Sequence, residues 1–287
     1  MTSAFSLITS IKGFVSLVKL IKRGVEMHKL NQSEMGKIAA LFDNWMETPI
    51  WSCLQGYMGR AWADDALEPK AAQIITGDLC FFAGEPNTQL VRNVPSDFPS
   101  RYLLMVPQNQ EWASLIECEH KGRYCKTMRY AIKKERDVFN RDRLNTYIQN
   151  LSKEFTLRKI DEVLYHSIKK EDWSKDLCSQ FPQYQDYKRM GLGYVVLHGE
   201  SIVSGASSYT AYNGGIEIEI DTREDFRRRG LALVCAARLI LECLDKGLYP
   251  SWDAANKESV ALAEKLGYNF DYEYLTYSID TGRIVDA

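Results

Sequence analysis

The sequence predicts a mixed α/β (α+β) protein. A smaller amino-terminal α+β domain precedes a carboxy-terminal domain in which strands and helices alternate. Three observations predict this fold class. The length of 287 residues exceeds the usual size of one domain. Apolar residues recur at helical spacing in some segments and alternate with polar residues in others. The composition, 45% hydrophobic and 26% charged, is typical of a soluble chain that buries a core. We expect domains at residues 27–150 and 151–287.

Residues 1–26 are expected to be an extension outside both domains. Their apolar residues are interrupted by Lys12, Lys19, Lys22 and Arg23, which break the run of about 20 apolar residues that a membrane-spanning helix needs. A signal peptide also fits badly, because its basic residues precede its apolar stretch. Two interpretations stay open: a basic amphipathic helix on a membrane surface, or a segment upstream of the working protein. We favour the second, with Met27 as the bacterial translation start.

The amino-terminal domain mixes helical and strand patterns. Apolar residues between Leu30 and Met46 recur at helical spacing behind the capping segment Asn31-Gln32-Ser33. The segment Trp51–Arg60 could line a pocket, but core packing is the preferred interpretation. A helix is expected at 112–117 and strands at 73–76, 79–83, 102–106 and 125–132. Because no phosphate loop or metal-ligand set is visible here, this domain is expected to be a packing domain or one that shapes a substrate site.

The carboxy-terminal domain is predicted to begin after a charged, exposed helix between Lys133 and Lys153. Helices are expected at 161–168, where Asp161 is the cap, and at 173–181, 185–190, 231–244 and 257–266. Strands are expected at 155–160, 193–197, 202–212, 216–222, 249–252 and 270–277. In the strand 216–222, isoleucines alternate with Glu217, Glu219 and Asp221, so one face is apolar and the other acidic.

Charge and cysteine usage restrict the partners. Lys and Arg number 36 against 38 Asp and Glu, a net charge of -2 that argues against a nucleic acid or an anionic membrane as partner. Seven cysteines without a CxxC pair are typical of reduced thiols in a cytoplasmic protein. Cys118, His120 and Cys125 lack a second ligand pair, so we expect no metal, and these thiols are expected to be buried. Cys235 and Cys243 are expected to pack in a core.

The segment from Arg227 to Ala232 carries the clearest chemical signal, because it lies between an expected strand and an expected helix. Backbone N–H groups at a helix start lack partners and lie at the positive end of the helix dipole, so they bind anions. Gly230 lets the backbone approach a pyrophosphate closely, and the small Ala232 keeps the next turn open. Positive charge is added by Arg227, Arg228 and Arg229.

Further motifs follow this turn: Trp252-Asp253-Ala254-Ala255-Asn256, then Ser259 and Lys265-Leu266-Gly267-Tyr268. In order and separation the set resembles the GNAT superfamily of acyltransferases, over about residues 155–277. The resemblance implies a mixed, mostly antiparallel sheet that is flanked by helices and splayed to admit acetyl-CoA. The segments 250–253, 259–268 and, less distinctively, 74–78 are similar to the subgroup that includes the zwittermicin A resistance acetyltransferases.

The resemblance implies acetyl-CoA, the acyl donor, as the bound cofactor. Its pantetheine arm would lie along the backbone of Ile220, Asp221 and Thr222. Its pyrophosphate would lie on the turn formed by Arg227, Arg228, Arg229, Gly230, Leu231 and Ala232. The helix that Asn256 opens, with Ser259, would form the other wall of the cleft. An Asn in this position is already explained as a helix cap.

The acidic strand supplies the candidates for proton removal. By the resemblance, Glu217 and Glu219 would accept, directly or through water, the proton that an ammonium loses before it attacks. We favour Glu217, because a β-bulge could reset which face each side chain occupies; the alternative is that both are surface carboxylates. Ala263 stands where many members carry an acidic tyrosine, so no general acid is assigned. Ser259, Tyr268, water or no acid at all remain open.

The sequence therefore predicts an acetyl-CoA-dependent N-acetyltransferase that acts on a primary amine of a small molecule or an aminated antibiotic. The alternative is a catalytically weak acyl-CoA-binding regulatory module, which the missing tyrosine favours. A peripheral membrane protein tethered by residues 1–24 is the rival from another class. A homodimer is left open.

Overall fold

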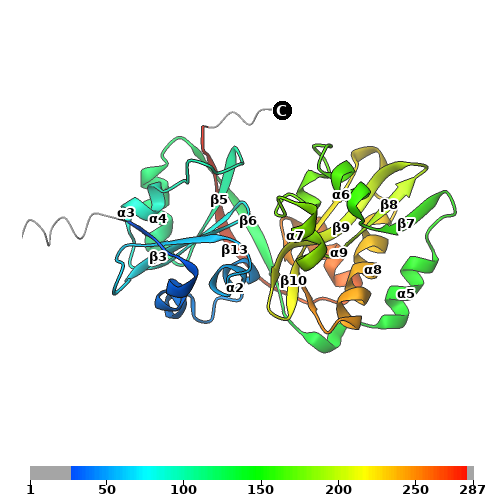
Figure 1. The fold of residues 1–287 in the computed structure, drawn as a ribbon, viewed down its shortest axis with the longest axis horizontal. Helices are drawn as coiled ribbons and strands as arrows, with labels where there is room; N and C mark the ends of the chain where they lie inside the picture. Colours follow the sequence, from blue (N-terminus) through cyan, green and yellow to red (C-terminus); the bar gives the residue numbers. More distant parts are fainter. Residues whose placement is uncertain (1–26, 283–287) are drawn as a thin grey trace, which may run out of the picture. The chain divides into compact units, whose positions relative to one another are not determined.

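The computed structural model describes residues 27–282, which form two compact units (Figure 1). The first unit contains residues 27–45, 60–125 and 277–282, and the second contains residues 46–59 and 126–276. These units differ from the continuous segments 27–150 and 151–287 expected from the sequence. One reason is α5 (Arg141–Gln149), whose buried Leu144 belongs to the core of the second unit. The expected extension, residues 1–26, lies outside the described residues.

The first unit is built on a sheet in the order β1-β2-β3-β4-β5-β13. Its strands are β1 (His28–Lys29), β2 (Arg60–Ala63), β3 (Ala71–Thr76), β4 (Leu79–Gly84), β5 (Tyr102–Pro107) and the last residues of β13 (Phe270–Asp280). Its α-helices are α3 (Thr88–Arg92) and α4 (Gln110–Glu119). The single helix expected from Leu30 to Met46 is instead two 3-10 helices, η1 (Gln32–Lys37) and η2 (Ala39–Phe42). Asn31 caps the first of them, as predicted, in a capping box with Glu34.

The second unit contains a five-stranded sheet in the order β11-β10-β9-β8-β7. The strands are β7 (Phe155–Lys159), β8 (Gly193–His198), β9 (Ser201–Tyr212), β10 (Gly215–Thr222) and β11 (Tyr249–Ser251). Beside them β12 (Asp253–Ala254) pairs with β6 (Tyr124–Ile132), which in turn neighbours β13. The helices are α2 (Thr48–Leu54), α5, α6 (Glu162–Ile168), α7 (Tyr184–Met190), α8 (Leu231–Asp245) and α9 (Lys257–Leu266).

Helices cover both faces of the five-stranded sheet. Successive side chains of β8 point to opposite faces, and each face packs against its own set of helices. Tyr194 and Val196 belong to one core with α5, α8 and α9, whereas Val195 and Leu197 belong to another with α6 and α7 (Figure 1). Helix α8 is the centre of the first core and is buried along most of its length. Cys235 and Cys243 are buried on it, which confirms their packing role.

Two expectations from the sequence are corrected. The helix expected at 173–181 is reduced to the 3-10 helix η4 (Lys175–Leu177). The carbonyl oxygen of Phe181 instead accepts hydrogen bonds from Tyr165 Oη and Lys169 Nζ. Cys118 and Cys125 are exposed rather than buried. No helix within residues 27–282 has the length and apolarity to cross a membrane.

The two units repeat one order of elements. In the first unit β2, β3 and β4 are antiparallel neighbours, α3 follows, and β5 pairs parallel with β4 before α4 begins. In the second unit β8, β9 and β10 are antiparallel neighbours, α8 follows, and β11 pairs parallel with β10 before α9. The two units therefore share a topology. They differ in the length of the parallel pairing, which joins four residue pairs of β4 and β5 but three of β10 and β11.

Candidate active site

Strands β10 and β11 of the second unit separate after three residue pairs. The paired residues are Gly215 with Tyr249, Ile216 with Pro250, and Glu217 with Ser251. On its other side β10 stays paired with β9 as far as Thr222. A β-bulge, considered in the sequence analysis, interrupts the β9–β10 register between Glu217 and Ile218. Beyond the bulge, β10 has a strand partner on one side only within the described residues, so the sheet opens here.

The turn from β10 to α8 has the backbone of an anion-binding site. Gly230 precedes the helix with φ +78°, a left-handed conformation that favours glycine, and no side chain caps the helix. A β-carbon added at Gly230 would meet nothing within 4 Å, so the space before the helix is open. The first N–H groups of α8 are therefore available to a negatively charged ligand.

The three arginines of this turn are all exposed but have different surroundings. Arg227 Nε donates a hydrogen bond to Thr222 O at 3.1 Å. Arg229 lies over the ring of Phe226, with its guanidinium carbon 4.7 Å from the ring centroid. Arg228 has a left-handed backbone with φ +61°. Arg227 thus fixes the end of β10, and the local positive charge expected from the sequence is present at the start of α8.

The segment between β12 and α9 is held by its own hydrogen bonds. Asn256 is the N-cap of α9, and its Oδ1 accepts a hydrogen bond from Ser259 N at 2.8 Å. Ser259 Oγ accepts a hydrogen bond from Trp252 Nε1 at 3.0 Å. The cap explanation for Asn256 is thus confirmed. Both polar side chains position the start of the helix next to the strand that separates from β10.

Glu217 is the last residue of β10 that pairs with β11. It is 4% exposed, so the interpretation as a surface carboxylate is wrong for this residue. Thr48 Oγ1 donates a hydrogen bond to Glu217 Oε2. Burial raises the pKa of Glu217, whereas Lys134 and the hydrogen bond from Thr48 lower it. Within the described residues, Glu217 Oε1 and the buried hydroxyl of its register partner Thr210 have no hydrogen-bond partner. The buried hydroxyl of Ser251, its register partner on β11, lies close enough to lower the pKa of Glu217. These three oxygens lie across three adjacent strands, where the sheet opens.

Two further buried carboxylates lie near Glu217. Asp253 is paired with Arg129, whose Nε donates to Oδ2 at 2.6 Å, and Tyr274 Oη donates to Oδ1 at 3.0 Å. Glu47, the N-cap residue of α2, is 3% exposed, and no side-chain hydrogen bond caps the helix. Burial and the charges of Asp253 and Glu217 raise the pKa of Glu47 to about 8, against the opposing effects of Lys134 and Arg129.

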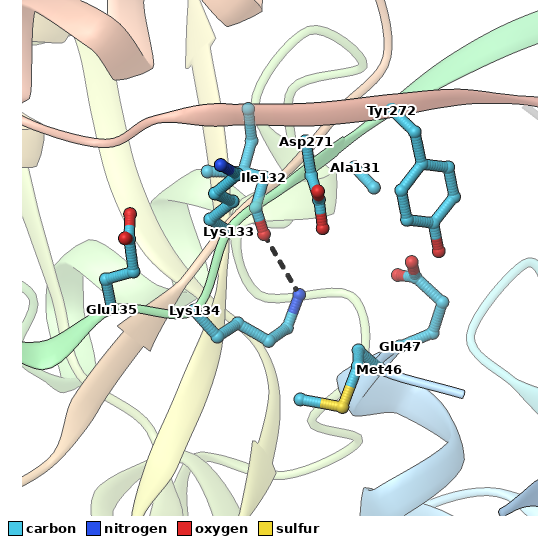
Figure 2. Close-up of a pocket in the computed structure, with 9 residues that line it drawn as sticks. All are labelled: Met46, Glu47, Ala131, Ile132, Lys133, Lys134, Glu135, Asp271 and Tyr272. Carbon is cyan, nitrogen blue, oxygen red and sulfur yellow. Dashed lines mark hydrogen bonds between the residues drawn. The ribbon is translucent and has the colours of Figure 1, made fainter. Parts of the chain in front are cut away.

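Glu47 lines a cavity of about 250 Å³ within the second unit. The other lining residues come from the start of α2, the end of β6 with the loop after it, and the start of β13: Met46, Ala131, Ile132, Lys133, Lys134, Glu135, Asp271 and Tyr272. Figure 2 shows the carboxylate of Glu47 directed towards the phenol of Tyr272, with the side chain of Lys134 across the cavity.

Comparison with known proteins identifies the family. The sequence model of the family described as GNAT acetyltransferase matches residues 39–277. The chain belongs to this family. It is therefore an acyltransferase of the GNAT type, as the sequence predicted.

Individual relatives agree with this assignment. The chain is 28% identical over 269 residues to the uncharacterized N-acetyltransferase YdfB of Bacillus subtilis, covering 88% of this chain and 98% of that protein. It is similar to a GCN5-related N-acetyltransferase-like protein of Streptococcus suis, at 43% identity and a TM-score of 0.82, covering 86% of this chain and 98% of that one. A tandem GNAT protein from the clavulanic acid pathway shares the fold at 10% identity and a TM-score of 0.54, covering 90% of this chain and 99% of that one.

The remaining predicted residues of this GNAT acetyltransferase lie along the open part of β10. Glu219 is half-buried beyond the bulge, and its Oε1 accepts a hydrogen bond from Ile220 N at 3.2 Å. Asp221 and Thr222 complete the strand, with the Thr222 hydroxyl 2.7 Å from Ser204 Oγ. Glu217 and Glu219 therefore have different environments, one buried at the paired end of β10 and the other along its open part.

Ala263, which the resemblance places where many family members carry a tyrosine, is fully buried in the core of the second unit. Tyr268, considered as a replacement acid, donates its hydroxyl hydrogen to Pro250 O at 2.6 Å and is buried. Burial raises the pKa of Tyr268 well above its ordinary value. Its hydroxyl hydrogen is already engaged in a hydrogen bond to a carbonyl oxygen, so Tyr268 is a poor proton donor to a leaving group.

Sequence reasoning missed Glu47 and Thr48, which the fold of this GNAT acetyltransferase places beside Glu217. They precede Trp51–Arg60, the segment that was expected chiefly to pack in a core. The local signal was weak: a carboxylate before Thr48-Pro49 indicates a helix start, and Pro49 is indeed near the first position of α2. Nothing in that pattern indicates a partner 169 positions later.

Proposed function

We propose that this enzyme transfers the acetyl group of acetyl-CoA to a primary amine of a small molecule. The observation that carries the proposal is the opening of the sheet: β10 leaves β11 at Glu217 and leads to the uncapped start of α8. An unpaired strand edge suits the amide groups of a pantetheine arm, and the start of α8 suits a pyrophosphate. Residues 220–222 and 227–232 would hold the donor, with Asn256 and Ser259 positioning the opposite wall.

The proposed proton acceptor is Glu217, acting directly or through water. In the transfer, a bond forms between nitrogen and the acetyl carbon, the bond from that carbon to sulfur breaks, and the ammonium must first lose a proton. A buried carboxylate with a raised pKa is suited to taking this proton near neutral pH. Glu219 is the second candidate, because it lies two residues further along the same strand.

The proposed acceptor is the amine of a small molecule such as an aminated antibiotic. It rests on the resemblance of residues 250–253 and 259–268 to zwittermicin A resistance acetyltransferases. The net charge of -2 gives no general preference for basic or acidic macromolecules.

Calorimetry with acetyl-CoA, followed by a thiol-release assay over a library of amines, tests the proposal. We expect acetyl-CoA to bind and at least one amine to release free thiol. Glu217→Gln should leave acetyl-CoA affinity unchanged and lower turnover by about 10²–10⁴-fold. Binding of acetyl-CoA without thiol release from any amine would favour the regulatory module. A folded protein that binds no acyl-CoA would contradict both.

A further inference from the structure

We propose that the cavity at the start of α2, lined by Glu47, is the acceptor site and that it takes a primary ammonium group. This inference rests on the proposed function, because an acceptor amine is required only if the enzyme transfers acetyl groups.

The shape of the cavity fits a small amine or the aminated end of a larger molecule. Its volume of about 250 Å³ is below the roughly 300–1,000 Å³ of pockets that enclose drug-sized ligands. Its rim is polar and exposed, with Lys133, Glu135 and Asp271, whereas Glu47 lies buried at the inner end. A ligand entering by the rim would meet the carboxylate of Glu47 last.

Glu47 is the feature that points to a ligand. The side chain is almost wholly buried, and within residues 27–282 no hydrogen bond or ion pair to its carboxylate is formed. Buried carboxylates in native proteins are normally paired, because an isolated charge in the interior is costly. Figure 2 shows this carboxylate among the residues that line the cavity, next to the hydroxyl group of Tyr272.

The surrounding charges favour a cation. Carboxylates face Glu47 from β10 (Glu217) and β12 (Asp253), whereas positive charge comes from β6 (Arg129) and the following loop (Lys134). Asp253 already pairs with Arg129, and Lys134 Nζ contacts the carbonyl oxygen of Ile132 at 3.4 Å. From β13, Asp271 and the phenols of Tyr272 and Tyr274 complete the surroundings. The carboxylates of Glu47 and Glu217 thus share one nearby ammonium group, that of Lys134. The ammonium group of a bound ligand would supply the second positive charge.

A primary ammonium fits better than a guanidinium. It is a compact charge with three hydrogen-bond donors, whereas a guanidinium needs a planar, bidentate partner. The carboxylate of Glu47 accepts such donors, and the hydroxyl oxygen of Tyr272, towards which it is directed, is a further acceptor for them. A neutral alcohol of the same size would leave Glu47 without a counter-charge.

The cavity is connected to the proposed reaction site through two consecutive residues, the N-cap Glu47 and the first residue of α2, Thr48. Thr48 donates its hydroxyl hydrogen to Glu217, and Glu47 precedes it in the chain. An amine held by Glu47 is therefore held next to the residue that fixes Glu217. The start of α2 would position the acceptor relative to the opening between β10 and β11.

Titration calorimetry with n-butylammonium chloride at a pH just above 8, where Glu47 ionises, tests the site. We expect saturable binding to the wild type and no binding of butan-1-ol. Glu47→Gln should weaken butylammonium binding by about 10–100-fold, since a charge-assisted hydrogen bond is lost. Glu47→Asp, which keeps the charge, should recover part of the affinity. Glu200→Gln, in the exposed turn between β8 and β9, is the matched control and should bind like the wild type.

A second titration, of the same wild-type and variant proteins with acetyl-CoA, separates the acceptor-site proposal from the proposed function. Acetyl-CoA binding with no butylammonium binding, or with equal butylammonium affinity in wild type and folded Glu47→Gln, would overturn the acceptor site alone. Butylammonium binding that depends on Glu47, with no acetyl-CoA binding, would overturn the proposed function and the acceptor role with it.

Discussion

The hydroxyl group of Thr48 donates a hydrogen bond to the buried carboxylate of Glu217, although 169 positions separate them in the chain. Thr48 belongs to the first turn of α2, and Glu217 is the last residue of β10 that pairs with β11. The helix is held on the sheet by a second bond of the same kind, from Ser52 Oγ to Ala211 O at 2.7 Å. A short segment from early in the chain therefore completes the surroundings of the proposed proton acceptor.

Replacing Thr48 by valine should move the pH dependence of the enzyme. The hydrogen bond lowers the pKa of Glu217, so its loss should raise that pKa further above its ordinary value. A bond to a charged group is worth about 1.5–3 kcal/mol, which corresponds to roughly 1–2 pH units. The profile of kcat/KM against pH should shift to higher pH by this amount. Ser52→Ala removes a hydroxyl from the same helix and should leave the profile in place; an equal shift would contradict the role of Thr48.

Much of the second unit could be predicted from the sequence, because its elements are local patterns. The bounds of α9 agree with the prediction, and those of α8 and β10 agree to within one residue. The turn at Gly230 was recognised because a glycine before an apolar helix has a specific backbone use. The helix expected at 173–181 was wrong, since helical spacing of apolar residues does not reveal that side chains will bind the carbonyl of Phe181.

Gly230 and Gly199 provide a matched test of the anion-binding turn. Both have left-handed backbones, with φ +78° and +60°, and an added β-carbon meets nothing within 4 Å at either position. Alanine at either site should therefore cost a similar amount of stability, about 1–2 kcal/mol. Only Gly230→Ala should also weaken acetyl-CoA binding in calorimetry, because Gly199 lies in the turn between β8 and β9. Equal affinities for the two variants would argue against a donor site at α8.

The partners of Glu217 could not be predicted from the sequence, because they depend on tertiary structure. Thr48 and Glu47 lie in a segment with no recognisable motif, and the fold alone brings them beside β10. The same limit applies to the repeated topology, since the two copies share an order of strands and helices without a visible sequence repeat. Only the second copy combines the opened sheet with the arginine-glycine turn.

One acetyl-CoA should bind per chain, although the topology occurs twice. In the first unit β4 stays paired with β5 from Leu79 to Phe82, so that sheet does not open as the second one does. The side chain of Asn87 caps α3 by accepting hydrogen bonds from Gln89 N and Leu90 N. These N–H groups are therefore not available to an anion. Calorimetric titration should give a stoichiometry of one, and Arg228→Glu should weaken that single site. A second site of similar affinity that survives Arg228→Glu would contradict this prediction.

Removing the carboxylate of Glu47 should change how stability depends on pH. Its pKa is raised from an ordinary value of 4.5 to about 8, so the folded protein binds the proton more tightly than the unfolded chain. The stabilisation from this proton is fully present below pH 4.5 and is lost as the pH rises towards 8, by up to about 1.4 kcal/mol per pH unit. Glu47→Gln should remove this contribution, so urea unfolding at several pH values should show a smaller decline for the variant between pH 4.5 and 8. Glu200→Gln, which removes an exposed carboxylate, should keep the wild-type slope. If Glu47→Gln also kept that slope, Glu47 would not be the buried, ionisable group that the structure indicates.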